Sequence, residues 1–167
     1  MDTRSAEEIR ADLSYLFDKA SIALAGRMAD ALDVLNISPR DYCVLSKAAP
    51  AALTQGELAE VALMDKTTMV VTLDRLEGDG LARRTPSPTD RRARIVETTD
   101  AGDTTVASAK TIIDDLYGEV LGVLSPEQRE VFLDAMVALV GPGGPLSEGD
   151  ATPLAPRRRT AKSSRTV

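Results

Sequence analysis

The chain has 167 residues, enough for one domain with a tail but not for two full cores. Hydrophobic residues make up 43%. No uncharged apolar run approaches the ~18 residues that cross a bilayer, and the first twenty residues are too charged for a secretory signal. We therefore expect a soluble, cytoplasmic protein with no membrane partner.

The composition also limits the chemistry. The chain has no histidine and a single cysteine, Cys43. This excludes histidine-based catalysis, Cys-rich metal sites and intramolecular disulfides. No nucleophile motif or carboxylate pair in an apolar pocket is recognisable, so we expect no enzyme activity, no cofactor and no metal.

The net charge of −6 is unevenly distributed. The first 140 residues hold 15 basic and 24 acidic residues, a net charge of −9. Within this acidic body, residues 81–96 carry a local charge of +4, from five arginines and Asp90. A basic strip on an acidic protein attracts phosphate and orients its approach. The arginines are Arg83, Arg84, Arg91, Arg92 and Arg94.

The first predicted element is a long helix over about residues 5–35. Ser5 and Glu8 have the spacing of a capping box, and apolar residues recur at helical intervals from Ile9 to Leu35. A helix of roughly thirty residues is too long to be covered by one small core. We expect its apolar stripe to pack partly against another subunit.

Three shorter helices should follow. Ser38 and Pro39 begin one that runs to about Ala48, and the capping box of Thr54 and Glu57 begins the second. The third should span residues 65–79, with Asp65 as its N-cap and Gly80 as its stop. Its expected buried residues are Met69, Leu73 and Leu76.

The rest of the body is predicted as a β-hairpin and two helices. Residues 81–86 and 93–98 read as strands joined by a turn with Pro88 and Asp90. A helix from about Asp100 has helical apolar spacing as far as Val123, and Ser125 caps a last helix that ends near 140. Residues 141–167 are rich in glycine and proline and are expected to be a disordered basic tail, which either adds DNA affinity or only solubilises.

Three helices followed by a hairpin are the pattern of a winged helix-turn-helix lobe. The helix over 65–79 starts with small or cationic residues that can approach base edges in the major groove. The hairpin would be the wing, whose arginines can enter the minor groove. The expected fold is therefore mainly α with a small β-hairpin wing, a winged helix-turn-helix lobe plus a helical dimerisation domain.

Several short motifs fall in the order and spacing of the MarR (multiple antibiotic resistance regulator) family, which the chain resembles over about residues 5–140. The motifs are Gly56-Glu-Leu-Ala59, Asp65-Lys-Thr-Thr68, Leu73-Asp-Arg-Leu-Glu77, Gly80-Leu, Arg84, Asp90-Arg-Arg92 and Thr99-Asp-Ala-Gly102.

This resemblance implies a homodimer that binds double-stranded DNA at a pseudo-palindromic operator. Residues 5–35 and 100–140 would form the dimerisation domain, and residues 36–99 the DNA-binding domain. It also implies transcriptional regulation, most often repression relieved by a small-molecule effector or an oxidant.

The resemblance further assigns roles to single residues. Arg92 would be the wing-tip residue in the minor groove, Asp90 the carboxylate that holds the wing arginine, and Arg84 a phosphate contact. Val70 and Val71 stand where many members place polar or basic residues, so hydrogen-bond readout should be thinner and shape readout more important. The full set of expected DNA-binding residues is Lys66, Thr67, Thr68, Val70, Val71, Arg75, Arg84, Asp90, Arg91, Arg92 and Arg94.

Other interpretations stay open. Adjacent residues on a helix cannot both face one core, so at least one of Val70 and Val71 should point outward. Cys43 is either a redox sensor or an inert buried thiol. A few aromatic residues could line an effector pocket or belong to the core: Tyr15, Phe17, Tyr42 and Tyr117. The alternative function is a winged-helix protein-interaction module that does not bind DNA.

Overall fold

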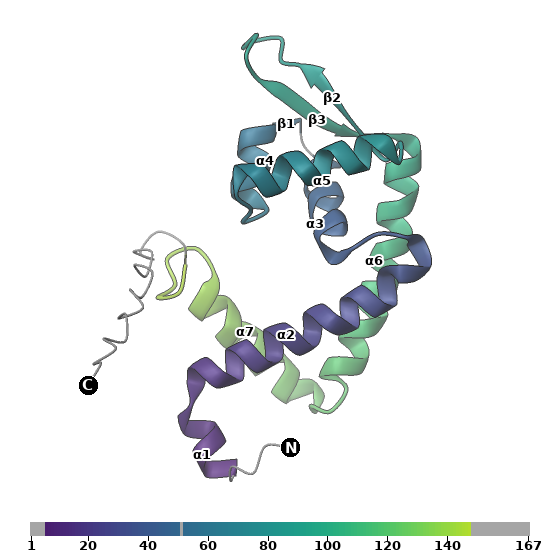
Figure 1. Ribbon diagram of the computed structural model, residues 1–167. Coiled ribbons are helices and arrows are strands. Elements are labelled where there is room, and N and C mark those ends of the chain that lie inside the picture. Colours follow the sequence, from purple (N-terminus) through teal and green to yellow (C-terminus); the bar gives the residue numbers. More distant parts are fainter. Residues whose placement is uncertain (1–5, 51, 148–167) are drawn as a thin grey trace, which may run out of the picture. The chain divides into compact units, whose positions relative to one another are not determined.

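The computed structural model of the chain describes residues 6–50 and 52–147. The chain divides into two compact units, one ending at Val120 and the other beginning at Leu121, and each is described by itself. Figure 1 shows the elements, which are α1 (Ala6–Ala11), α2 (Leu13–Leu32), the 3₁₀ helix η1 (Asp33–Leu35), α3 (Pro39–Ala48), β1 (Leu53–Thr54), α4 (Gln55–Val61), α5 (Lys66–Gly78), β2 (Ala82–Pro86), β3 (Arg94–Thr98), α6 (Asp100–Leu121) and α7 (Pro126–Val140).

The predicted single helix over 5–35 is wrong, because the structure interrupts it twice. Asp12 lies between α1 and α2, and its carboxylate accepts a hydrogen bond from the backbone N–H of Tyr15 at 3.0 Å. A short carboxylate that binds a nearby backbone N–H favours a new helix start over continuation. The helix then ends at Leu32, and η1 leads to Asn36 in the left-handed conformation. Ser5 lies outside the described residues.

The other predicted helix starts are confirmed. The capping boxes of Ser38 with Asp41, Thr54 with Glu57 and Ser125 with Gln128 are all formed. These bonds satisfy the first backbone N–H groups of α3, α4 and α7, which have no partner inside the helix.

The predicted stop of α5 at Gly80 is confirmed as well. Gly80 has φ +70°, and the N–H of Leu81 donates to the carbonyl of Leu76 at 2.9 Å. This is the backbone pattern in which a glycine closes a helix without a steric cost.

The predicted hairpin is present, but it belongs to a three-stranded antiparallel sheet with strand order β1-β3-β2. Arg83 pairs with Glu97 and Arg84 with Val96 across the hairpin, and Leu53 of β1 pairs with Val96 on the other side. Two residues are too few to show the alternating pattern of a strand, so β1 was not predicted from the sequence. Figure 1 shows the hairpin projecting from the lobe beyond α5.

The unit that ends at Val120 has two hydrophobic clusters. The winged lobe is built around Met69, Leu73 and Leu76 of α5, all fully buried as predicted, together with side chains from α3, α4 and the sheet. A second cluster joins Leu32 at the end of α2 to Ile113 and Leu116 of α6. Leu81 packs partly against both clusters and so links the lobe to the helices.

Thr99 and Gly102 fix the junction between the wing and α6. The hydroxyl of Thr99 donates to the carbonyl of Gly80 at 2.7 Å and accepts from the N–H of Gly102 at 3.0 Å. A Cβ on Gly102 would lie 2.0 Å from the carbonyl oxygen of Leu81. Only glycine therefore permits this approach of helix and loop.

The unit that begins at Leu121 contains α7, which has no buried residue. Val131, Phe132, Leu133 and Val137 are all at least 45% exposed. Residues 141–147 form turns next to the end of α7, where the N–H of Leu146 donates to the carbonyl of Leu139 at 2.9 Å. The remainder of the expected tail, residues 148–167, lies outside the described residues. None of the described helices has the length and hydrophobicity of a membrane-spanning segment.

Candidate nucleic-acid interface

The first turn of α5 is held by Asp65. Its carboxylate accepts from the N–H of Thr68 at 2.9 Å and from the Thr68 hydroxyl at 2.6 Å. The hydrogen bonds from Thr68 hold the pKa of Asp65 below its ordinary value. Lys66 and Thr67 are exposed beside this cap, and Thr68 is half-buried. Three of the predicted residues thus lie together at the N-terminus of one helix.

The middle of α5 exposes both valines. Val70 is 38% exposed and Val71 is 64% exposed, while Met69 and Thr72 on either side are buried. The expectation that at least one of the two valines points outward is confirmed. The face of α5 opposite the core therefore carries an apolar patch.

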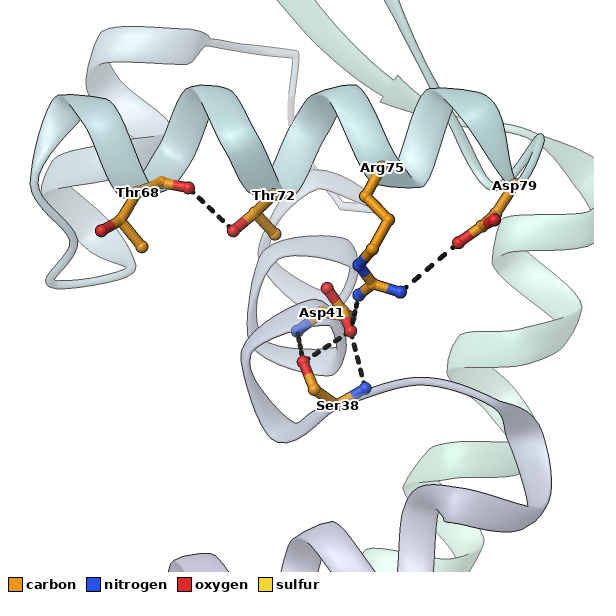
Figure 2. A network of polar contacts seen from close by, with 6 residues as sticks. All are labelled: Ser38, Asp41, Thr68, Thr72, Arg75 and Asp79. Atoms are coloured by element: carbon orange, nitrogen blue, oxygen red, sulfur yellow. Dashed lines mark hydrogen bonds and ion pairs between the residues drawn. The ribbon is translucent and has the colours of Figure 1, made fainter.

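Arg75 points away from that face and toward α3, as Figure 2 shows. Its guanidinium forms an ion pair with Asp41 and a second, at 3.4 Å, with Asp79. The Asp41 side chain is 2% exposed and also accepts from the backbone N–H of Ser38 at 2.6 Å. A buried carboxylate needs such partners, so Arg75 has a structural role at the contact of α3 and α5.

Arg84 also has partners inside the protein. Its guanidinium is paired with Glu77, and one nitrogen lies 2.5 Å from a carboxylate oxygen of Asp74. The backbone N–H of Arg84 donates to Glu77 as well, at 2.6 Å. These hydrogen bonds lower the pKa of Glu77 and raise that of Arg84.

The resemblance led us to expect a phosphate contact by Arg84, and these carboxylates compete with a phosphate for its guanidinium. With two carboxylates on its guanidinium and only 22% of its side chain exposed, its charge is neutralised locally. Arg84 instead ties β2 of the wing to α5.

The tip of the wing is shaped by Ser87 and Asp90. The buried hydroxyl of Ser87 accepts from the N–H groups of Thr89 and Asp90 at 3.3 and 3.2 Å. The Asp90 carboxylate accepts from the backbone N–H of Arg92 at 2.8 Å. Asp90 therefore holds Arg92 through its backbone N–H and not through its guanidinium.

The wing cations fall into two groups. Arg83 is paired with Glu97 at 2.8 Å across the hairpin, which leaves it little attraction for an external anion. Within the described part of the chain, the remaining wing arginines are exposed and are paired with no carboxylate. They are Arg91, Arg92 and Arg94.

Four carboxylates form the ion pairs of Arg75, Arg83 and Arg84 described above, and these pairings were not predicted from the sequence. They are Asp41, Asp74, Glu77 and Glu97. Each is an ordinary acidic residue in the sequence. Only Glu97 carried a usable signal, because the hairpin register sets it opposite Arg83. Arg84 and Glu77 meet only once β2 folds back onto α5.

The remaining candidates lie apart from this surface. Cys43 is half-buried against the lobe core, and Tyr42 packs against the second cluster. The Tyr117 hydroxyl lies 3.9 Å from the sulfur of Met28, and burial raises the pKa of Tyr117. Among the described residues, no group of three or more metal-ligating side chains could hold a metal ion.

Known proteins of similar sequence and structure exist for this lobe. Residues 31–93 match the model of the MarR family. The chain is 40% identical over 81 residues to the transcriptional regulator HosA of Escherichia coli O111:H-, an alignment that covers 48% of this chain and 60% of HosA. The likeness to HosA thus spans less than two thirds of that protein's length.

Two solved structures extend the likeness to the fold. CouR from Rhodococcus jostii RHA1 bound to p-coumaroyl-CoA is 26% identical, with a TM-score of 0.67 over 76% of this chain and 90% of CouR. A mutant MarR from E. coli complexed with operator DNA is 23% identical, with a TM-score of 0.71 over 80% of this chain and 96% of that one. Of these proteins, HosA is named as a transcriptional regulator. Residues 31–93 are therefore similar to the MarR family, and the chain shares the winged fold of CouR.

Proposed function

We propose that the protein is a homodimeric transcriptional regulator that binds double-stranded DNA at a pseudo-palindromic operator. The observation that carries the proposal is the pairing pattern of the arginines. Among the described residues, guanidiniums without a carboxylate partner are concentrated on the projecting hairpin (Figure 1), and Lys66 at the start of α5 is exposed as well. A concentrated positive charge on an acidic protein favours a polyanion at that one place.

In this proposal α5 enters the major groove and the hairpin follows the backbone into the minor groove. Lys66 binds phosphate, and Thr67, Thr68, Val70 and Val71 lie along the base edges. Arg91, Arg92 and Arg94 contact the neighbouring backbone and groove, with Asp90 fixing the turn. Arg75 and Arg84 act as positioning residues, because their ion pairs hold α3 and the wing against α5.

Dimerisation through residues 5–35 and 100–140 is part of the proposal. In the first unit Leu13 and Ile22 of α2 are 58% and 75% exposed. In the second unit α7 exposes several large apolar side chains and buries none. Apolar surface of this kind on terminal helices is typical of a protein–protein interface. Analytical ultracentrifugation should give twice the chain mass.

We also propose that the regulator is a repressor released by a small molecule, and that it acts in the cytoplasm alongside the DNA it binds. The support for an effector is the likeness to CouR, whose structure holds p-coumaroyl-CoA. This would be tested by screening acyl-CoA and aromatic acids for loss of binding to the selected duplex.

The central experiment is selection of bound duplexes from a random pool. We expect one enriched sequence with two inverted half-sites about one helical turn apart. Arg92→Ala should weaken binding to it by about 1–3 kcal/mol. If no duplex is enriched and the affinity for random DNA is negligible, the lobe is a protein-interaction module instead.

A further inference from the structure

The exposed face of α5 offers unusual chemistry for a helix that reads DNA. At about 100° per residue, Thr67 and Val71 lie on the side opposite Met69 and Leu73, two of the fully buried residues of the helix, whereas Val70 lies at the edge of the exposed side and is 38% exposed. The two valines carry four methyl groups and no hydrogen-bonding atom in their side chains. The middle of the exposed face is therefore apolar.

The polar side chains farther along α5 are held elsewhere. Asp74 is paired with Arg84, and Arg75 is paired with Asp41 and Asp79. The Thr72 hydroxyl donates to the carbonyl of Thr68 at 2.8 Å. Releasing any of these groups to a base would break an interaction that the fold uses.

Only one feature of the major groove suits an apolar side chain. Thymine carries a methyl group at C5, whereas the other base edges display amines, carbonyls and ring nitrogens. A valine placed over those polar edges would remove their water without replacing its hydrogen bonds. Placed over a thymine methyl it buries apolar surface from both partners.

We propose that Val70 and Val71 are the specificity-determining residues of the reading helix and that they select thymine through its 5-methyl group. This inference rests on the proposed function, since it presumes that α5 enters the major groove. It requires at least one thymine at a fixed position in each half-site, recognised without a direct hydrogen bond.

The test replaces single thymines by deoxyuridine in the duplex selected from the random pool. Uracil keeps the Watson–Crick pairing and loses only the methyl group. A buried methyl corresponds to about fourfold in affinity, so substitution in both half-sites should weaken binding about fifteenfold. All other thymine positions should tolerate the change.

Variants then identify the protein partner. Val70→Ala or Val71→Ala should weaken binding to the thymine duplex. Replacing by uracil the thymine that the mutated valine contacts should then cause little further loss of affinity. Val61→Ala serves as the matched control, because Val61 is 46% exposed at the end of α4 and belongs neither to the proposed DNA contacts nor to the segments proposed for dimerisation. It should respond to uracil as the unmodified protein does.

The outcomes separate the two proposals. If a duplex is enriched but no uracil substitution weakens binding, thymine selection by methyl contact is refuted while DNA binding stands. Thymine selection by the valines is also refuted if uracil weakens the unmodified protein and both valine variants equally, since another residue or the DNA shape then senses the methyl. If no duplex is enriched at all, both proposals fail.

Discussion

The division of the arginines into paired and unpaired groups predicts how steeply DNA binding depends on salt. Each phosphate neutralised by a cation releases counterions, which gives a slope of about −0.9 per contact in a plot of log affinity against log salt. At the candidate interface, each protomer presents four exposed cations that are paired with no carboxylate among the described residues. They are Lys66, Arg91, Arg92 and Arg94.

A dimer would bring eight such cations to the DNA, so the expected slope is about −7. Raising the salt from about 50 to 200 mM should then lower the affinity about 10⁴-fold. If the paired residues Arg75, Arg83 and Arg84 also bound phosphate, the slope would be about −13. Fluorescence anisotropy of a labelled duplex at five or six salt concentrations distinguishes these values.

Two variants sharpen the measurement. Arg92→Ala removes one unpaired cation from each protomer and should make the slope shallower by about 2. The control is the double variant Arg83→Ala/Glu97→Ala, which removes a whole ion pair without changing the net charge. It should leave the slope unchanged. A slope near −13 would show that the paired arginines also bind phosphate, and equal slopes for the unmodified protein and Arg92→Ala would show that Arg92 does not.

Three further predictions concern the supports of the interface, and each is checked by urea denaturation. Asp41→Ala should lower the free energy of unfolding by about 1–2 kcal/mol, since it removes the carboxylate of the α3 capping box and one of the two ion pairs of Arg75; a loss below about 0.5 kcal/mol would contradict this. Hydrogen bonds from the Arg84 side chain lower the pKa of Glu77 below 4.5. The ionised Glu77 therefore stabilises the fold above pH 4.5, and this stabilisation is lost as the pH falls through the lowered pKa. Glu77→Gln should therefore flatten the loss of stability below pH 4.5, and an unchanged acid limb would argue against the pair. Gly102→Ala should cost about 1–3 kcal/mol by clashing with a backbone carbonyl, whereas Gly118→Ala, with open space around its Cβ, should stabilise α6 by about 0.5–1 kcal/mol.

The sequence was informative wherever structure depends on neighbouring residues. The starts of α3, α4, α5 and α7 were predicted because a cap and its partner lie within three residues of each other. The stop of α5 at Gly80 and the hairpin were also predicted, because each depends on turn residues that are close together in the sequence. The local charge of +4 over residues 81–96 also needed no tertiary knowledge.

The predictions failed where the apolar spacing hid a side-chain hydrogen bond to the backbone, or where an element was too short to show any pattern. The apolar spacing continues smoothly past Asp12, yet its carboxylate starts a new helix there. The strand β1 has only two residues, and its pairing with β3 depends on a segment more than forty residues away. Helical spacing likewise extended to Val123, although α6 ends at Leu121.

Composition and local turns are properties of the chain, so the order of residues is enough to place a group of arginines on a hairpin after a helix-turn-helix. Which arginines remain available to DNA depends on contacts between segments that are distant in the sequence. Arg84 meets Glu77 only when the wing folds against α5, and Arg75 meets Asp41 only when α5 crosses α3. Charge depends on residue type, but its neutralisation depends on which carboxylates the fold brings within a few ångströms.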